Sequence, residues 1–514
     1  MYRVRTTKTA SKNTAVQIVR RGDHKITVVK HIGTAKNDDE LRELIEKANR
    51  YIIQTSKTTP LLPEVFKDSN SVNIDDLEFT NTYHTFAYEF LSYFYDRCGF
   101  KKLNNELLRD LAIIRVVEPC SKLQAVYLLR EYFGRNLGKT VMYEKLPLIR
   151  DLKKDIEESA VAYAKKYFTF DFSLVFYDVT TLYFESFKED EDKKDDKGKV
   201  ITGLRKPGFS KDNKSNQPQI VIGLIVTREG FPVSYDIFEG NTFEGKTFIP
   251  TITKFRDAYS VKKLIVVADA AMISFDNVEK LKENTLSYIV GARVANLKQS
   301  QIEEVSKAIS GTDAKTIRIE TERGLLICEF SIKRYDKDKR EMEKQIARAE
   351  KLVEKNAEGK RAKFLKLKKE RKKKEVLYEV NATLAEKTKL LLGIKGYYTN
   401  LTNEEDKTII DHYHSLWHVE KAFRMAKSDL QARPIFHHKK ESIEVHILIV
   451  FVSLCIAKAI ELLTNLSIKK VKEMIWRILD IEFIDTFTKK EFRRRMVTRG
   501  SEMAKLLSTL QNEN

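Results

Sequence analysis

One acidic residue inside an apolar run constrains this chain more than any other feature. Residues 172–179 read FSLVFYDV, a run of β-branched and aromatic side chains that is typical of a strand covered on both faces. Asp178 lies inside this run. A carboxylate in a central strand is costly unless a partner or a metal ion neutralises it. The neighbouring sequence offers no clear partner, so we interpret Asp178 as a functional residue.

The segments after Asp178 predict a small α/β unit. Its apolar runs are separated by turn residues such as Arg228-Glu229-Gly230, and Thr242 is a suitable N-cap. The predicted elements are strands over 219–227, 231–239, 263–268 and 286–292, and helices over 242–259 and 275–283. With the strand of Asp178 in first place, the order is three strands, helix, strand, helix, strand. This order resembles that of the ribonuclease-H-like fold, in which the first and fourth strands lie side by side.

Asp269 directly follows the fourth predicted strand. Ligand sites in α/β sheets usually lie at the carboxyl ends of strands. If the first and fourth strands are neighbours, Asp178 and Asp269 come together. Two adjacent carboxylates repel each other and bind protons more tightly unless cations neutralise them. A divalent metal ion is the simplest way to satisfy both.

A third acid, Glu420, lies on a predicted helix that reads YHSLWHVEKAFRMAK. At about 100° per residue, Glu420, Arg424 and Lys427 all project within about 40° of Tyr413. Such a face suits a carboxylate that holds a divalent cation while flanking cations bind phosphate oxygens. A solvated amphipathic helix with ordinary charge pairs is the alternative.

The composition favours a polyanionic partner. The 514 residues include 93 Lys and Arg against 74 Asp and Glu, which gives a formal net charge of +19. Such a surplus attracts phosphate backbones, although a ribosome or an anionic membrane would fit the same number. The four cysteines lack the spacing of a structural zinc site, which indicates a reduced, intracellular protein.

No membrane-spanning segment is expected. The N-terminus lacks the apolar core of a secretory signal, and the longest apolar run, Ile447–Ile456, is too short to span a bilayer. We therefore expect residues 442–463 to form a buried helix of a cytoplasmic protein.

The chain divides into five regions around an α/β core, a mixed sheet flanked by helices. The regions are 1–165, a small β element followed by helices; 166–295, the first part of the core with both Asp; 296–400, an insertion; 401–464, the second part of the core with the Glu helix; and 465–514, a helical C-terminal region. The basic residues of the first region predict that it binds DNA ends. Packing of this region on the core as a scaffold is the alternative. The insertion is expected to contain a β-hairpin, a Lys/Arg-rich helical hairpin over 334–375 and a strand-like segment over 390–401.

Several motifs in this order resemble the DDE transposases of insertion sequences, in the group whose acidic helix carries a Tyr-x2-Arg-x3-Glu-x6-Lys signature. The motifs are FYDVTTLYFES, GFSKDNKSNQPQ, VVADAAM and YHSLWHVEKAFRMAK. The resemblance implies that Asp178, Asp269 and Glu420 are catalytic and bind two Mg²⁺ ions, with Mn²⁺ as a substitute. It also implies that Tyr413 and Lys427 contact DNA phosphates near the cleaved end.

The chain departs from the signature at its Arg, where Leu416 stands. We hypothesise that Arg424 supplies the phosphate contact, because it projects within about 40° of Glu420 on the predicted helix. Arg433 is a second candidate. Lys211 projects from the loop GFSKDNKSNQPQ, and we expect it to bind DNA as well.

The resemblance implies a transposase that binds the terminal inverted repeats of its own element, cuts the ends and joins the 3′-OH groups to target DNA. Its partners would be double-stranded DNA and further copies of itself, as a homodimer or a larger assembly on the nucleoid of a prokaryotic cell. Three alternatives stay open: a nuclease with the same site that does not transpose, a domesticated DNA-binding relative, and a basic scaffold that binds RNA or the ribosome.

Overall fold

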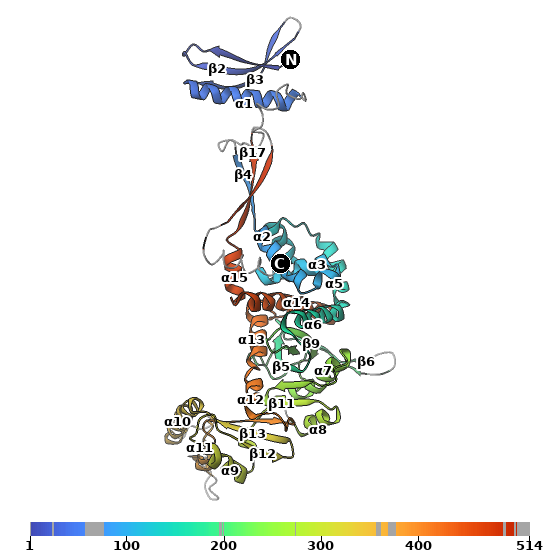
Figure 1. Cartoon of the computed structure of the whole chain (residues 1–514), viewed down its shortest axis with the longest axis vertical. Coiled ribbons are helices and arrows are strands. Elements are labelled where there is room, and N and C mark those ends of the chain that lie inside the picture. Colours follow the sequence, from blue (N-terminus) through green and yellow to red (C-terminus); the bar gives the residue numbers. More distant parts are fainter. Residues whose placement is uncertain are drawn as a thin grey trace. The chain divides into compact units, whose positions relative to one another are not determined.

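The computed structural model describes residues 2–22, 25–56, 77–194, 198, 200–272, 274–355, 361–368, 377–486, 490–497 and 500 (Figure 1). Contacts divide the chain into two compact units. One combines Met1–Phe86 with Arg477–Thr498, and the other contains Ala87–Trp476. The predicted boundaries differ, because residues 87–165 belong to the same unit as the predicted core.

An eight-stranded mixed sheet forms the centre of the larger unit, in the order β12-β13-β16-β11-β10-β5-β8-β9. The bounds are β5 Leu174–Tyr183, β8 Gln219–Val226, β9 Pro232–Glu239, β10 Ile265–Ala268, β11 Ser287–Ala292, β12 Thr316–Thr321, β13 Gly324–Phe330 and β16 Ile394–Thr399. β10 is parallel to both β5 and β11, and the other neighbours are antiparallel. The predicted pairing of the first and fourth strands is therefore confirmed as the pairing of β5 with β10.

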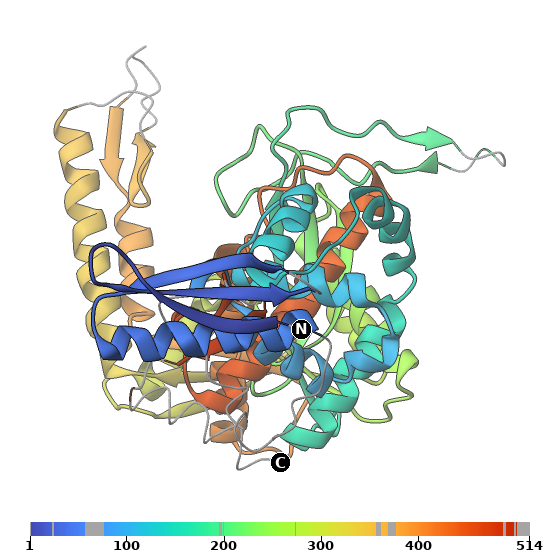
Figure 2. The ribbon, with the colours of Figure 1, turned by 90° about the horizontal axis from the view of Figure 1, so that it is seen from above.

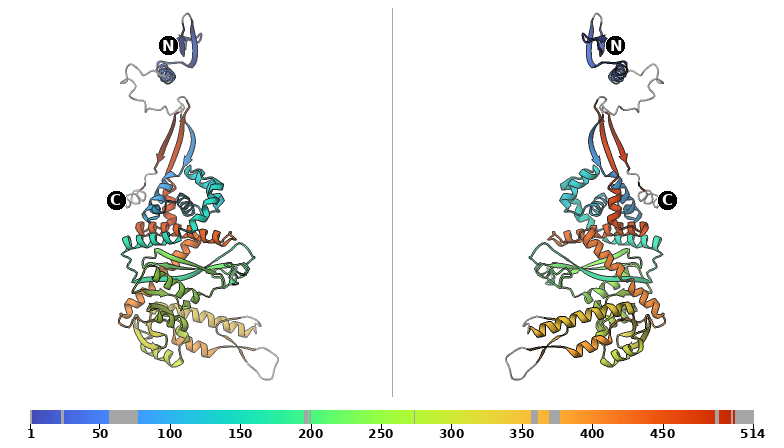
Figure 3. Two further views of the ribbon diagram at one scale, coloured as in Figure 1. Left: turned by 90° about the vertical axis from the view of Figure 1, so that its right-hand side faces the viewer. Right: turned by 90° about the vertical axis from the view of Figure 1, so that its left-hand side faces the viewer.

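Helices cover the sheet and bury its apolar strands. α6 (Lys153–Phe168) and α14 (Lys440–Thr464) pack on β9, and α7 (Glu244–Ala258) packs on β8 and β9. Figure 3 shows α6 and α14 side by side over the strands. α14 is long and apolar enough to cross a membrane, but 83% of its most apolar window is buried inside the protein. This burial agrees with the predicted core helix over 442–463.

The helices that precede β5 are α2 (Thr85–Arg97), α3 (Glu106–Val117), α4 (Lys122–Phe133), α5 (Lys139–Arg150) and α6. α3 and α5 pack on α14, as expected for a scaffold. Two basic residues of this region, Arg115 and Lys122, are only 8% exposed. Arg115 donates hydrogen bonds to the backbone carbonyls of Leu430 and Gln431, so it holds a loop of the core.

The insertion does not form a separate layer, because β12, β13 and β16 extend the central sheet. The predicted helical hairpin over 334–375 is wrong in its second half. α10 (Ile332–Glu354) is followed by the paired strands β14 (Leu365–Lys368) and β15 (Leu377–Val380), while residues 356–360 and 369–376 lie outside the described residues. Apolar residues alternate with lysines in β14, which suits a strand, and Lys366 forms a 3.0 Å ion pair with Glu379 across the pair.

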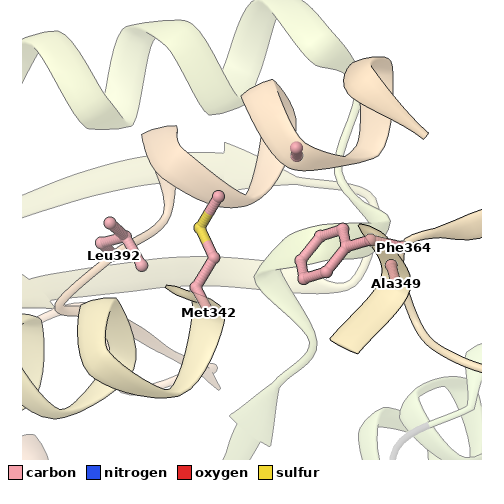
Figure 4. Close-up of a cluster of buried hydrophobic side chains, with 5 residues drawn as sticks. Met342, Ala349, Phe364 and Leu392 are labelled. Carbon is pink, nitrogen blue, oxygen red and sulfur yellow. The ribbon is translucent and has the colours of Figure 1, made fainter. Parts of the chain in front are cut away.

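A small core holds the outer part of the insertion together. Met342 and Ala349 of α10, Phe364, and Ala385 and Leu392 from α11 (Ala382–Leu390) and its C-terminal end are all buried. Figure 4 shows Met342 extending between Leu392 and Phe364. In Figure 2, α10, β14 and β15 project from one side of the larger unit, and the short ribbon of β6 (Lys193–Lys194) and β7 (Val200–Ile201) projects from another.

The smaller unit contains two sheets. The predicted N-terminal β element is a three-stranded sheet of β1 (Tyr2–Lys8), β2 (Thr14–Arg21) and β3 (Ile26–Ala35), packed on α1 (Asp38–Ser56). The prediction of an all-helical C-terminal region is wrong. After α15 (Ile468–Ile475), β17 (Leu479–Asp485) pairs with both β18 (Glu491–Met496) and β4 (Leu77–Tyr83). Because β4 lies far away in the sequence, a local pattern gave no sign of this sheet.

Candidate active site

The pairing of β5 with β10 places the two predicted Asp residues on neighbouring strands. Ala268 is in register with Tyr177, so Asp269 follows β10 at the level of Asp178 in β5. Asp178 is half-buried, whereas Asp269 is exposed at the end of its strand. Burial raises the pKa of Asp178 to about 6, with a further increase from the charges of Asp269 and Glu244 and an opposing effect of Lys211. The repulsion expected between two adjacent carboxylates is therefore present.

The predicted continuous helix over 413–427 is wrong. Tyr413 is in α12 (Asp406–His414), whereas Glu420 is in α13 (Trp417–Arg424), and a π-helical turn, η6 (Met425–Asp429), contains Lys427. A π-turn advances by about 4.4 residues instead of 3.6, so it shifts the direction of every side chain after it. Glu420 and Arg424 share one face of α13, whereas Tyr413 and Lys427 are separated from them by these two interruptions.

The hydroxyl group of Tyr413 is hydrogen-bonded to one of the predicted acids. It donates a 3.1 Å hydrogen bond to Oδ1 of Asp269, and the side chain is buried. The pKa of Tyr413 is raised by burial and by the charges of Asp269, Glu420 and Asp178. Of the three carboxylates, Asp269 contacts the phenol directly, and the charges of Asp178 and Glu420 add to the increase in its pKa.

Gly291 leaves room for this phenol. It lies in β11, and a Cβ atom at this position would overlap the hydroxyl oxygen of Tyr413 and lie 3.1 Å from the backbone nitrogen of Ala270. The close approach of Tyr413 to the end of β10 therefore requires a residue without a side chain at position 291.

Asp178 and Asp269 offer hard oxygen donors on adjacent strands. In the described part of the chain, no three His, Cys, Asp or Glu side chains are placed to hold one ion. Mg²⁺ is usually bound by one or two carboxylates, with water and substrate phosphates as its other ligands. Neighbouring acids with hard oxygen donors and unbalanced charge fit that pattern.

Three of the predicted DNA contacts lie around the loop that carries Asp212. Lys427 and Arg433 form ion pairs with Asp212, at 3.3 and 3.0 Å. Lys211 donates a 2.7 Å hydrogen bond to the carbonyl of Val179, beside Asp178, and pairs with Glu244 at 2.9 Å. Lys211 thus lies beside Asp178, whereas Lys427 and Arg433 meet at Asp212.

Arg424 has a different neighbourhood. It is exposed at the end of α13, and it is one of the cations that oppose the burial-raised pKa of Asp429. Leu416, at the position of the signature's Arg, is 6% exposed and begins α13 as its N-cap residue. Arg424 lies four residues after Glu420 in α13, as predicted, and Arg433 lies with Lys427 at Asp212.

Sequence reasoning missed four residues of this site. Glu244 begins α7 and faces Lys211, Asp212 joins Lys427 to Arg433, and Gly291 accommodates Tyr413. The fourth, Lys395 in β16, has its Nζ 4.5 Å from the ring centroid of Tyr413. A lysine after the apolar run LLLGI was the available signal, but only the sheet order shows that β16 pairs with β11.

Comparison with known proteins identifies the family. A model described as the transposase DDE domain matches residues 170–456, more than half of the 514-residue chain. The chain belongs to the transposase DDE domain family, as the motifs predicted. No curated protein matches it at a significant level.

Two solved structures show distant similarity. A piggyBac transposase synaptic complex with hairpin DNA matches with a TM-score of 0.37 and 10% identity over 73% of this chain and 70% of the other. The Mos1 mariner paired end complex with Mn matches with a TM-score of 0.15 and 13% identity, over 30% of this chain and 43% of the other.

Gly291→Ala should destabilise the protein by about 1–3 kcal/mol, because the added methyl group overlaps the Tyr413 hydroxyl. Removing that hydroxyl with Tyr413→Phe should relieve most of the overlap. Urea unfolding of the two single variants and the double variant measures the coupling. If Gly291→Ala lowered the free energy of unfolding equally in the wild-type protein and in Tyr413→Phe, overlap with the hydroxyl would not be the cause.

Asp178→Asn should stabilise the metal-free protein at pH 8. The folded-state pKa of Asp178 is raised from 3.8 to about 6, so ionisation destabilises the folded chain. The penalty is absent below pH 3.8, grows toward pH 6 and is constant above it. The free energy of unfolding, measured with urea in EDTA, is compared between Asp178→Asn and the wild-type protein at each pH. The advantage of the variant should be larger at pH 8 than at pH 4 by on the order of 1–3 kcal/mol.

Asp171→Asn is the matched control for this measurement. Asp171 is exposed just before β5, and hydrogen bonds from Ser173 lower its pKa. Its replacement should give no stabilisation at pH 8. A gain for Asp178→Asn that is equal at both pH values would show that ionisation is not the cause.

Proposed function

We propose that this protein is a DNA transposase that binds the terminal inverted repeats of an insertion sequence, cleaves the ends by metal-dependent hydrolysis and joins the 3′-OH ends to target DNA. Membership of the transposase DDE domain family supports the class of reaction. The observation that carries the proposal is the pairing of β5 with β10, which sets Asp269 beside Asp178, together with the hydrogen bond from Tyr413 to Asp269. A ribonuclease-H-like core accounts for the adjacent positions of the two Asp residues.

Asp178, Asp269 and Glu420 would hold two Mg²⁺ ions, for which Mn²⁺ can substitute. When bound, such a pair activates the attacking oxygen and stabilises the leaving oxygen of an in-line displacement at phosphorus. The raised pKa of Asp178, about 6, leaves this carboxylate ionised at neutral pH and therefore able to accept a cation. Tyr413 orients Asp269 through its hydrogen bond.

The basic residues around the acids would bind the DNA backbone. Lys427 and Arg433 are paired with Asp212, and Lys211 is paired with Glu244. Phosphate oxygens of DNA could take over these contacts, because Asp212 and Glu244 are themselves acceptors of the same geometry. Tyr413 and Arg424 are further proposed contacts.

The net charge of +19 supports a partner as large and as anionic as double-stranded DNA. We propose a homodimer or larger assembly on the paired ends, which would supply one active site for each end. The site of action would be the nucleoid in the cytoplasm of a prokaryotic cell.

A second candidate is a domesticated nuclease or DNA-binding protein of the same family that no longer transposes. The three carboxylates are all present, which favours retained catalysis. An assay that separates strand transfer from nicking decides between these functions.

Asp178→Asn, Asp269→Asn and Glu420→Gln should each lower cleavage by at least about a thousandfold, because each removes one charged metal ligand. The substrate is a supercoiled plasmid that carries the inverted repeats flanking the gene, incubated with Mg²⁺ or Mn²⁺. Binding of the same DNA in EDTA should be unchanged within about twofold. Cleavage by any of the three variants at the wild-type rate would reject the proposed site.

Arg433→Ala should lower strand transfer by about tenfold or more, because it removes a charged phosphate contact beside Lys427. Arg424→Ala tests the other candidate under the same conditions. Activity of Arg424→Ala within about twofold of wild type rules out Arg424 as the phosphate contact. An unchanged rate for Arg433→Ala would rule out Arg433.

A further inference from the structure

Three side chains form a polar network next to Tyr413. The carboxylate of Glu329 in β13 accepts a hydrogen bond from the hydroxyl of Tyr397 in β16. Nε2 of His414 lies 3.2 Å from the same hydroxyl and 3.3 Å from Oε1 of Glu329. Glu329 and Tyr397 belong to the insertion, whereas His414 directly follows Tyr413 at the end of α12. The network therefore joins the insertion to the helix end that carries Tyr413.

Packing alone does not require a carboxylate at position 329. All other residues of β13 are apolar, and the side chain of Glu329 is only 16% exposed. A buried carboxylate is destabilising unless polar groups satisfy it. In the register of β13 with β16, Glu329 is opposite Lys395 and has Tyr397 as its diagonal neighbour. Burial and the bond to Glu329 raise the pKa of Tyr397, so this phenol stays protonated and donates its proton to the carboxylate.

Tyr397 supports the ring of Tyr413. The two ring centroids are 4.8 Å apart, with an angle of 56° between the ring planes. Tyr397 is fully buried and is opposite Gly291 in the pairing of β11 with β16. Because a Cβ atom at Gly291 would overlap the Tyr413 hydroxyl, the phenol of Tyr413 occupies the space that this glycine leaves beside Tyr397. A residue that fixes Tyr397 therefore also restricts Tyr413.

The Tyr413 hydroxyl connects this packing to Asp269. It donates its hydrogen bond to Oδ1 of Asp269, which leaves the lone pairs of Oδ2 for a cation. Outer-shell partners of this kind orient a metal ligand, and their removal typically costs about 10- to 100-fold in metal affinity. The position of Tyr413 should therefore affect how Asp269 is presented to a metal ion.

We propose that Glu329 is a positioning residue of the acid site. It fixes Tyr397, which holds Tyr413 in place. The Tyr413 hydroxyl then orients Asp269 toward the bound cation. The inference rests on the proposed function, because it requires Asp269 to be a metal ligand. Neutralisation of Lys395, which is opposite Glu329, is the other role of a carboxylate at this position, and the test separates the two roles.

The test measures Mn²⁺ affinity and does not depend on catalysis. Electron paramagnetic resonance of free Mn²⁺ gives the dissociation constant of Mn²⁺ for the 514-residue protein on a pre-cleaved duplex of the inverted repeat that flanks the gene. Glu329→Gln and Tyr397→Phe should each raise this constant by about threefold to tenfold, less than the loss of a direct outer-shell partner. Tyr397→Phe leaves every charge in place, so a weaker affinity of this variant cannot come from the loss of a charge near Lys395.

A double-mutant cycle shows whether the effect passes through Tyr413. Tyr413→Phe alone should raise the Mn²⁺ dissociation constant by about 10- to 100-fold. Adding Glu329→Gln to Tyr413→Phe should change the constant by no more than about twofold, because the hydroxyl that transmits the effect is already absent. A carboxylate that acted only by its charge would weaken Mn²⁺ binding equally in both backgrounds.

Tyr288→Phe is the matched control. Tyr288 is another fully buried tyrosine of the same sheet, and its hydroxyl donates a 2.7 Å hydrogen bond to the backbone carbonyl of Arg323. Its replacement removes a buried hydroxyl outside the network and should leave the Mn²⁺ dissociation constant within about twofold of wild type. Urea unfolding verifies that each variant is folded, and Tyr397→Phe alone decides the test if Glu329→Gln does not fold.

Wild-type Mn²⁺ affinity in Tyr397→Phe would overturn the inference and leave the proposed function in place. The same conclusion would follow if Tyr288→Phe lost as much affinity as Tyr397→Phe, or if Glu329→Gln had the same effect with and without the Tyr413 hydroxyl. Absence of Mn²⁺ binding by the wild-type protein would instead refute the proposed function, and the inference with it.

Discussion

The hydrogen bonding of β5 to β10 is the interaction on which the candidate site depends. It joins two segments that are distant in sequence, and its register sets Asp269 beside Asp178 at the end of a buried pair of strands. The neighbouring strand β8 is buried at every position and holds β5 in the middle of the sheet. The fold thereby keeps Asp178 in an environment that raises its pKa. The ionised carboxylate is unfavourable there unless a cation is bound. A bound divalent ion would compensate this unfavourable placement.

The insertion takes part in the same sheet, and this gives it a direct route to the site. β16 pairs with β11 on one side and with β13 on the other. Its neighbour β11 contains Gly291, which makes room for Tyr413. Lys395 of β16 has its Nζ 4.5 Å from the ring centroid of Tyr413. One continuous sheet thus contains Asp178, Gly291 and Lys395, and Asp269 directly follows one of its strands. Movement of the insertion relative to the acids would require breaking strand pairs, so we regard the two as one working unit.

Elements with a local sequence pattern could be predicted from the sequence alone. The strands around Asp178 and Asp269 are continuous apolar runs, and one topological rule was enough to pair them. The break after α12 was not visible, because Ser415 and Leu416 both have nearly helical backbone angles and leave the periodic pattern unchanged. The strand pairs of β14 with β15 and of β17 with β4 and β18 depend on partners chosen by tertiary structure. For the same reason, the position of Lys395 beside the acids could not be read from its neighbours in the chain.

The central claim is that the three carboxylates form a site for divalent ions, and direct counting of bound Mn²⁺ tests it without reference to activity. Electron paramagnetic resonance of free Mn²⁺ during titration of the protein with its DNA gives the number of ions bound per chain. The account predicts two ions for the wild-type protein and a loss of at least one when Asp269 is replaced by Asn. Binding of no ion, or the same number in both proteins, would contradict it.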